Sequence, residues 1–436
     1  MLFVDRNNTE AAKTSEKLKE RYYVNDTAIE IISLIDGNKT LSDIINILAK
    51  KYDEDTESIQ SKVEKFLGSI KENYNVTVGF SDKPIDKPVK IRKVDNIYPV
   101  VASIELTYKC NLRCLHCYGE YGTNDISEMK LEDAKKLLLD LKDIGVQILE
   151  FTGGDVSLYP HLKELLEFAL SLDYKFISIL TNSVVMKDEI FDLVIANANK
   201  FVMQIDLHSL DDEYLKWFTK ASNTVEIIKS NIKKMVDNGV VIRVATIATK
   251  KNVDELEKIA DWLHDNGVIN SAMGPVISLG RAKNNDVLLD DIESIKKFND
   301  AIERINSKYK NFVSMIEDTK PFRANCGSLT SNVTITPNGD IKHCTMDNLE
   351  YVNSSIGNVF KDGSIKQIYD KNREYIDAIF STKPPKLNLP ECKECMHKYF
   401  CANCLLRGFI KHKEIGDECK WYQNLVPQIV KNKLSI

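Results

Sequence analysis

The sequence predicts an α/β protein built around a parallel sheet, with a further domain on either side of it. Between residues 101 and about 280, apolar runs typical of strands alternate with segments of helical periodicity. The ten cysteines fall into two groups, three at 110–117 and seven at 326–419. Since a chain of 436 residues usually divides into several domains, we expect domains at 1–80, 101–310 and 311–436, with a linker at 81–100.

Composition and charge exclude several classes of protein. The chain has 59 basic and 64 acidic residues and a net charge of −5, so its overall charge gives no electrostatic case for binding nucleic acid or an acidic membrane surface. It begins Met1-Leu-Phe-Val without a basic region and a long apolar run, and no run approaches 18 apolar residues, so we expect neither a signal peptide nor a membrane span. We therefore expect a cytoplasmic protein, in which cysteines favour metal binding over disulfides.

The first 80 residues predict a small domain of strands and three short helices. Candidate strands lie at 2–4, 21–24 and 76–78, and a first helix runs from Asn25 or Asp26 to about Asp36. Thr40 and Asp43 form a capping-box pattern that starts the second helix. The third helix is marked by apolar residues at helical spacing: Ile59, Val63, Phe66, Leu67 and Ile70. These elements suggest a winged helix without a basic face for DNA, and a dimerisation or packing domain remains an alternative.

The central region contains six candidate strands. They are Ser103–Thr107, Gln147–Phe151, Phe176–Leu180, Phe201–Leu207, Val240–Ala248 and Ser271–Ile277. A helix at Leu131–Ile144, ended by Gly145, connects the first two. Because ligands bind at the carboxyl ends of parallel strands, we expect the functional residues just after these runs.

The motif after the first strand is Cys110-Asn-Leu-Arg-Cys114-Leu-His-Cys117-Tyr118. Three thiolates on one tight loop can hold three irons of a four-iron cluster at a small cost in closure entropy. The fourth iron then lacks a ligand from the loop and can bind a small molecule. On spacing alone, a zinc loop or buried structural cysteines are the alternatives.

This cysteine loop, with aromatic Tyr118 directly after it, resembles the signature of the radical S-adenosylmethionine (SAM) superfamily. The resemblance implies a partial (β/α)6 barrel and SAM chelated by the open iron. An electron from the cluster then cleaves SAM to methionine and a 5′-deoxyadenosyl radical, which abstracts hydrogen from a substrate. The cofactor supplies this chemistry, while the protein positions and shields it.

The ends of the next two strands fit the same resemblance. Gly153-Gly154-Asp155 stands at the family's GGE position, with aspartate where glutamate is usual. Its glycines would let the backbone approach the SAM methionine, and Asp155 would accept from the SAM amino group. Asn182, after the third strand, belongs to a turn similar to the family's Thr-Asn-Gly.

Later strands supply three further candidates. Asp206 and His208 end the fourth strand, where they could contact the ribose hydroxyls or the substrate, and Arg243 on the fifth could pair with the SAM carboxylate. For His208 an ordinary packed histidine is an equally good interpretation, and for Arg243 a structural salt bridge.

The seven later cysteines resemble the SPASM domain, which carries two auxiliary four-iron clusters. The resemblance implies an outer cluster on Cys392, Cys395, Cys401 and Cys419. It also implies an inner cluster on Cys326, Cys344 and Cys404, which leaves one iron open or held by another ligand. One gap departs from the family pattern, two residues instead of three between Cys401 and Cys404. Taken alone, 392–404 could be a zinc ribbon.

Residues 25–37 resemble the PqqD-like domain, a recognition element that binds the leader of a ribosomally made precursor peptide as an added strand. Together the resemblances imply a peptide maturase nearest to sactionine- and ranthipeptide-type thioether synthases, which join a cysteine sulfur to a carbon. The expected cofactors are SAM and three [4Fe-4S] clusters. The expected partners are a precursor peptide with its leader and a reductant such as flavodoxin or ferredoxin.

Other functions stay open at this point. Carbon–carbon cross-linking, or another peptide oxidation by the same parts, is the nearest. A maturase of sulfatase-like enzymes fits less well, because residues 1–80 imply leader binding. A non-catalytic iron–sulfur or zinc sensor belongs to a different class, and it would not cleave SAM.

Overall fold

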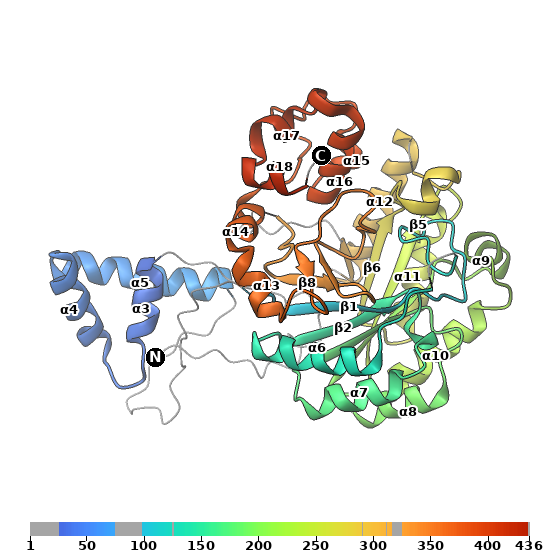
Figure 1. Ribbon diagram of the computed structural model, residues 1–436, viewed down its shortest axis with the longest axis horizontal. Coiled ribbons are helices and arrows are strands. Elements are labelled where there is room, and N and C mark those ends of the chain that lie inside the picture. The colour runs from blue at the N-terminus through green and yellow to red at the C-terminus, as the bar shows by residue number, and fades with distance from the viewer. Residues whose placement is uncertain are drawn as a thin grey trace. The chain divides into compact units, whose positions relative to one another are not determined.

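The computed structural model describes residues 26–74, 98–123, 126–289, 291–310, 312–315 and 325–434. The chain forms two compact units, Met1–Ile97 and Tyr98–Ile436 (Figure 1). The strands expected at 2–4, 21–24 and 76–78 lie outside the described residues, as does nearly all of the expected linker at 81–100.

The first unit contains the three predicted helices, α3 (Asp26–Leu34), α4 (Leu41–Tyr52) and α5 (Thr56–Tyr74). The predicted capping box of α4 is present, since Thr40 Oγ1 accepts from Asp43 N and the Asp43 carboxylate accepts from Thr40 N. The helices bury one shared apolar cluster made by Ile31, Ile44, Ile45, Leu48, Ala49, Ile59, Val63 and Leu67. Burial of these side chains is the main force that holds such short helices together.

The second unit is organised around one sheet, which has ten strands in the described residues, in the order β10-β9-β8-β1-β2-β3-β4-β5-β6-β7. The six predicted strands are all present: β1 (Val101–Thr107), β2 (Ile148–Gly153), β3 (Phe176–Thr181), β4 (Phe201–Asp206), β5 (Val241–Ala248) and β6 (Asn270–Pro275). Each pairs in parallel with the next. The parallel run continues through β7 (Val313–Met315).

The other edge of the sheet comes from the late cysteine region. Strand β8 (Asn332–Ile335) pairs in parallel with β1, and β9 (Asp340–Lys342) and β10 (Gly357–Asn358) follow as antiparallel strands. A hairpin turn at Asn338-Gly339 joins β8 to β9, and Gly339 has the positive φ of 91° that such a turn favours. The residues around Cys344 are therefore fixed to the strand that precedes the cysteine loop.

Helices cover the outer side of the sheet (Figure 1). They are α6 (Leu131–Asp143), α7 (Leu162–Ser171), α8 (Asp188–Ala196), α9 (Asp212–Thr219), α10 (Val225–Asp237), α11 (Leu256–Asp265) and α12 (Ile292–Lys308). Their apolar residues pack against buried strand side chains such as Leu149 and Phe151. The alternate strand positions carry polar groups, and Ser103 Oγ donates to Glu150 Oε2 across 2.6 Å. One face of the sheet is thus core, while the other is a polar lining.

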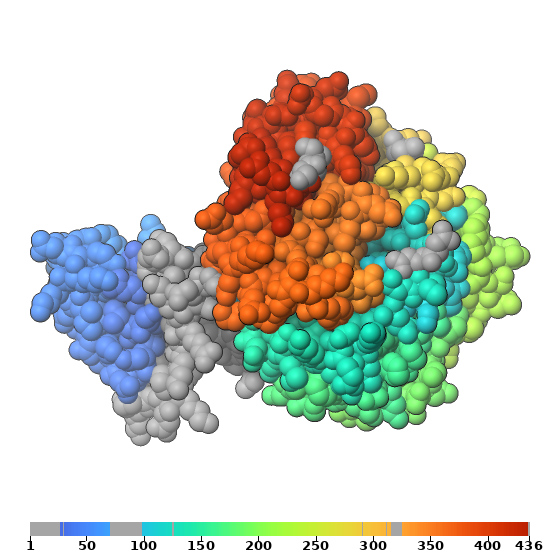
Figure 2. All heavy atoms as spheres, viewed as in Figure 1, coloured from blue at the N-terminus to red at the C-terminus, as the bar shows by residue number. Residues whose placement is uncertain are grey.

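The C-terminal helices are α13 (Ile365–Lys371), α14 (Arg373–Ser381), α15 (Lys398–Cys401), α16 (Leu405–Ile415), α17 (Lys420–Leu425) and α18 (Gln428–Leu434). In the space-filling view, the orange and red atoms of this region lie directly against the rest of the same unit (Figure 2). Among the described residues, no helix is both long enough and apolar enough to cross a lipid bilayer.

Candidate functional site

The cysteine loop follows the carboxyl end of β1, and its backbone is held by residues from other elements. Arg113 N donates to Thr219 O across 2.9 Å, and Leu115 N donates to Phe218 O across 2.8 Å. Within the loop, Cys117 N donates to Cys114 O across 3.2 Å. The three thiols therefore project from a rigid loop that is packed onto the end of α9.

The chemistry of these thiols fits an iron–sulfur cluster. Burial raises the pKa of Cys110 to about 11, and burial together with the neighbouring Cys117 and Cys110 raises the pKa of Cys114 well above its usual range. Without a cation, the thiols of Cys110 and Cys114 are consequently protonated at neutral pH. Bound iron supplies the positive charge that makes three neighbouring thiolates stable.

The loop after β2 is packed against the backbone that leads into the cysteine loop. A Cβ on Gly153, whose φ is 131°, would lie 2.3 Å from Thr107 O, and a Cβ on Gly154 would lie 2.2 Å from Lys109 O. Gly154 N also donates to Thr107 O across 2.7 Å. The glycines are therefore required by close contact of the chain with itself, whether or not they also contact SAM.

Asp155 joins the ends of β2 and β3. Its buried carboxylate accepts from Asn182 N and Ser157 N, each across 2.8 Å, and from Thr181 Oγ1 across 3.0 Å. Burial raises the pKa of Asp155, while these donors oppose the rise. This aspartate orients the turn that contains Asn182.

Asn182 in turn contacts the cysteine loop directly. Its Nδ2 donates to Asn111 Oδ1 across 2.9 Å, and Asn111 lies between Cys110 and Cys114. Sequence reasoning did not single out Asn111, although its place inside the motif was the available signal. The structure thus brings the ends of β1, β2 and β3 together, as the strand-end argument predicts.

His208, at the end of β4, is part of a packed aromatic group. Its ring lies 4.9 Å from that of His116 and 5.2 Å from that of Phe218, and His116 stacks on Phe218 at 4.8 Å. Its Nδ1 accepts from Ile247 N across 3.2 Å, and burial lowers the pKa of His208 to about 4. This geometry favours a neutral packed histidine with Nε2 carrying the proton.

Asp206 lies on the same strand but faces the cysteine loop. Burial, and then the charge of Asp155, raise the pKa of Asp206 to about 7. The carboxylate also contributes to the raised pKa of Cys114. Asp206 is therefore an ionisable group next to the loop that can carry a proton near neutral pH.

Arg243 lies in the first half of β5, away from the strand ends. It pairs with Gln204 in the sheet register, and its Nη2 donates to Ser314 Oγ of β7 across 3.1 Å. The structure therefore places Arg243 in the polar lining of the sheet, apart from the candidates around the cysteine loop.

A short segment after β6 clamps the cysteine loop from the other side. Arg281 Nε donates to Cys114 O across 2.8 Å, and Arg281 N donates to Cys117 O across 3.0 Å. Tyr351 OH donates to Tyr118 O across 3.0 Å and accepts from Gly280 N across 2.5 Å. Sequence reasoning missed Arg281 and Tyr351, because neither belongs to a motif with local spacing.

Tyr118 lies between the cysteine loop and the C-terminal cysteines. Its side chain hydrogen bonds Thr345, and burial together with the neighbouring Glu105, Cys117 and Cys344 raises the pKa of its phenol. The residue after the third loop cysteine is therefore also a neighbour of Cys344.

The seven later cysteines gather into two groups. Burial raises the pKa of Cys344, and the neighbouring Cys404, Asp347 and Cys326 raise it further. Burial, and then the neighbouring Cys419 and Cys395, raise the pKa of Cys401 to about 12. The same two residues are neighbours of Cys392. None of the ten cysteines is in a disulfide. These neighbours divide the seven cysteines into a set of three and a set of four, and among the described residues no group of three or more His, Cys, Asp or Glu side chains is arranged to hold a single metal ion.

Comparison with family models divides the chain in the same order. Residues 15–74 match the model of coenzyme PQQ synthesis protein D (PqqD), residues 104–263 match the radical SAM superfamily, and residues 326–396 match the SPASM iron–sulfur cluster-binding domain. These matches confirm the three expected kinds of domain, namely a PqqD-like domain, a radical SAM domain and a SPASM domain.

Two curated relatives are named for the biosynthesis of a bacteriocin and for the maturation of a killing factor. The chain is 26% identical over 415 residues to the antilisterial bacteriocin subtilosin biosynthesis protein AlbA of Bacillus subtilis (strain 168). The aligned region covers 92% of this chain and 88% of AlbA. The chain is also 25% identical to the sporulation killing factor maturation protein SkfB of the same organism, over 53% of this chain and 57% of SkfB.

Among solved structures, SuiB of Streptococcus suis bound to S-adenosylmethionine shares the fold. Its TM-score is 0.60 at 16% identity, with 92% of each chain covered. SuiB bound to the precursor peptide SuiA also has a TM-score of 0.60, at 15% identity, with 94% of each chain covered. The predicted α/β fold with a radical SAM-type sheet is confirmed.

Proposed function

Because this chain is a radical SAM enzyme that also carries a PqqD domain and a SPASM domain, we propose that it matures a ribosomally synthesised peptide by forming a thioether. In this reaction the sulfur of a precursor cysteine is joined to a carbon of another residue. The observation that carries the proposal is the similarity to AlbA across 92% of the chain, which spans all three domains.

Each cysteine group has a proposed cluster. Cys110, Cys114 and Cys117 would hold the SAM-binding [4Fe-4S] cluster. The outer auxiliary cluster would lie on Cys392, Cys395, Cys401 and Cys419, and the inner one on Cys326, Cys344 and Cys404. When bound, the loop cluster and SAM supply a 5′-deoxyadenosyl radical.

The chain's own residues would position and shield this chemistry. Arg281 and Tyr351 fix the backbone of the cysteine loop, while Asp155 and Asn182 fix the neighbouring strand ends. Asp206 can hold a proton beside the loop, since its pKa is about 7. Tyr118 has both Cys117 and Cys344 as neighbours, so it lies beside two of the proposed cluster sites.

Two partners complete the proposal. The first unit would bind the leader of a precursor peptide as an added strand, as its PqqD match suggests. A small reductant such as flavodoxin or ferredoxin would supply electrons in the cytoplasm, where thiols stay reduced.

The test is product analysis. The anaerobically reconstituted enzyme is incubated with SAM, a reductant and a cysteine-rich precursor encoded near its gene, and the peptide is then alkylated. Each thioether should remove two hydrogen atoms and protect one cysteine from alkylation. A product that loses two hydrogens but keeps every cysteine reactive would instead indicate carbon–carbon cross-linking. The Cys114→Ala variant should give neither product.

A further inference from the structure

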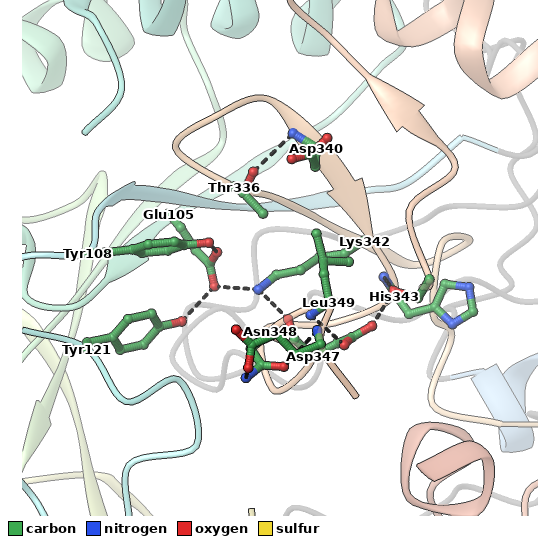
Figure 3. Close-up of polar contacts among 12 residues, drawn as sticks. Glu105, Tyr108, Tyr121, Thr336, Asp340, Lys342, His343, Asp347, Asn348 and Leu349 are labelled. Atoms are coloured by element: carbon green, nitrogen blue, oxygen red, sulfur yellow. Dashed lines mark hydrogen bonds and ion pairs between the residues drawn. The ribbon is translucent and has the colours of Figure 1, made fainter. Parts of the chain in front are cut away.

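A fully buried ion pair joins the strand before the cysteine loop to the strand before Cys344. Lys342 Nζ lies 3.0 Å from Glu105 Oε1, and the two side chains are 1% and 0% exposed. Figure 3 shows the ammonium of Lys342 between the carboxylate of Glu105 and the turn at Asp347. Neither residue belongs to a motif or to the proposed cluster ligands.

The carboxylate of Glu105 accepts hydrogen bonds from residues on both sides of the cysteine loop. Tyr108 OH, two residues before Cys110, donates to Glu105 Oε2 across 3.1 Å. Tyr121 OH, four residues after Cys117, donates to Glu105 Oε1 across 2.9 Å. The two tyrosine rings also pack together at 5.2 Å. One carboxylate therefore binds a tyrosine on each side of the cysteine loop (Figure 3).

Lys342 makes the matching contact on the auxiliary side. Its Nζ donates to Asp347 O across 2.5 Å, and Asp347 N donates to Cys344 O across 3.2 Å. The Asp347 carboxylate accepts from Leu349 N across 2.9 Å and from Ser354 Oγ. The turn that contains Cys344 is thus tied through Lys342 to Glu105.

Stability alone is a poor reason for such a pair. The free energy lost when two charges are removed from water offsets most of the attraction between them. Apolar side chains of similar volume often stabilise a protein core at least equally. A buried pair does, however, define one geometry, because each charge has a single place where it is neutralised. Here the ion pair fixes the position of the cysteine loop relative to Cys344.

We propose that Glu105 and Lys342 are a positioning pair that holds the SAM-binding loop and the inner auxiliary site in register, so that radical formation is coupled to bond formation on the peptide. The inference rests on the proposed function, since it assumes that both sites act on one substrate. Loss of the pair should leave radical formation possible but should separate it from cross-linking.

The test compares two variants with a surface control. Lys342→Met keeps the aliphatic stem but removes the ammonium, and Glu105→Gln combined with Lys342→Met leaves no unpaired buried charge. Lys366→Met is the control, because its ion pair with Asp370 lies on the surface, with Lys366 61% exposed. Iron content, melting temperature, 5′-deoxyadenosine and cross-linked peptide are measured for each protein.

We expect both buried-site variants to keep their iron and to cleave SAM. The yield of cross-linked peptide per 5′-deoxyadenosine should fall about 10- to 100-fold, as for a small misplacement of reacting groups. The reduced inner cluster should also show a changed paramagnetic signal. The control should match the wild type in every measurement.

Two results would overturn the inference. One is a folded double variant, with full iron, whose coupling ratio equals that of the wild type. The other is loss of iron or of folding in both variants, which would make the pair structural only. If the wild type itself cleaves SAM but cross-links no cysteine-rich precursor, the proposed function fails, and the inference fails with it.

Discussion

Arg281 Nε donates to the backbone oxygen of Cys114 across 2.8 Å, so a residue after β6 fixes the loop after β1. Its Nη1 also donates to Tyr121 O across 3.2 Å. We predict that Arg281→Lys and Arg281→Ala both reduce SAM cleavage, by about tenfold or more. Alanine makes neither contact, and lysine lacks the planar guanidinium that donates to both backbone oxygens at once. Arg304→Ala, which removes an exposed pair with Glu257, should leave the rate unchanged. Equal rates for Arg281→Ala and the wild type would contradict a clamping role.

The cysteine groups predict an iron count. The anaerobically reconstituted protein should hold about 12 irons, from three four-iron clusters. Cys110→Ala, Cys114→Ala or Cys117→Ala should abolish SAM cleavage and leave roughly eight irons, because the auxiliary sites use other cysteines. Metal analysis after native anaerobic purification is the check. Zinc in place of iron at the 392–419 site would rule out the outer auxiliary cluster.

The first unit should provide recognition and not chemistry. Because it forms a compact unit separate from Tyr98–Ile436, removal of residues 1–80 should leave SAM cleavage in the absence of peptide intact. Precursor affinity should fall strongly, since strand addition to this unit would supply the binding energy. Binding titrations with the full precursor and with its leader alone test this directly. An unchanged affinity in the truncated protein would argue decisively against leader recognition by this unit.

Asp206 predicts a pH dependence of stability. Its pKa is raised from 3.8 to about 7 in the folded protein, so folding favours the neutral acid. The stability cost of ionisation therefore appears as pH rises from about 4 and is complete above about 7. Asp206→Asn lacks this cost, so its melting temperature relative to the wild type should rise between about pH 4 and pH 7 and stay level above that. A difference that is independent of pH would show that Asp206 is not perturbed.

Local sequence signals predicted the elements and the ends of the strands. Alternating apolar runs and helical periodicity located β1 to β6, since each element buries a face that its own residues encode. The Thr40–Asp43 capping box was visible for the same reason. Cysteine spacing identified the thiol groups before any contact between distant residues was known.

Long-range contacts could not be predicted in this way. Glu105 and Lys342 are 237 residues apart, and nothing near either residue indicates a buried partner. The pairing of β8 with β1 is equally non-local, so the sequence could not show that the first strand of the late cysteine region extends the sheet. Arg243 was a candidate SAM contact because it is a basic residue on a strand. Its sequence, however, gives no sign of how far it lies from the carboxyl end of that strand.

The inner cysteine group leads to a last prediction. Cys326, Cys344 and Cys404 provide three thiolates for four irons, so one iron is open to a substrate ligand in the proposed cluster. Metal binding favours the deprotonated sulfur, and a precursor cysteine bound there as thiolate would lie near the site where a carbon radical forms. Formation of the bond would then be an intramolecular step, and the electron left over would pass to the cluster.

The experiment is spectroscopic. Addition of a precursor that contains the acceptor cysteine should perturb the paramagnetic signal of the inner cluster, whereas the same precursor with Cys→Ser should perturb it much less. The Cys114→Ala variant, which lacks the loop cluster, simplifies the spectrum without altering the inner thiols. If both peptides leave the signal unchanged, or if a protein side chain occupies the fourth iron with peptide bound, direct ligation is wrong. The auxiliary clusters would then serve as electron relays, and carbon–carbon cross-linking would become the better account of the reaction.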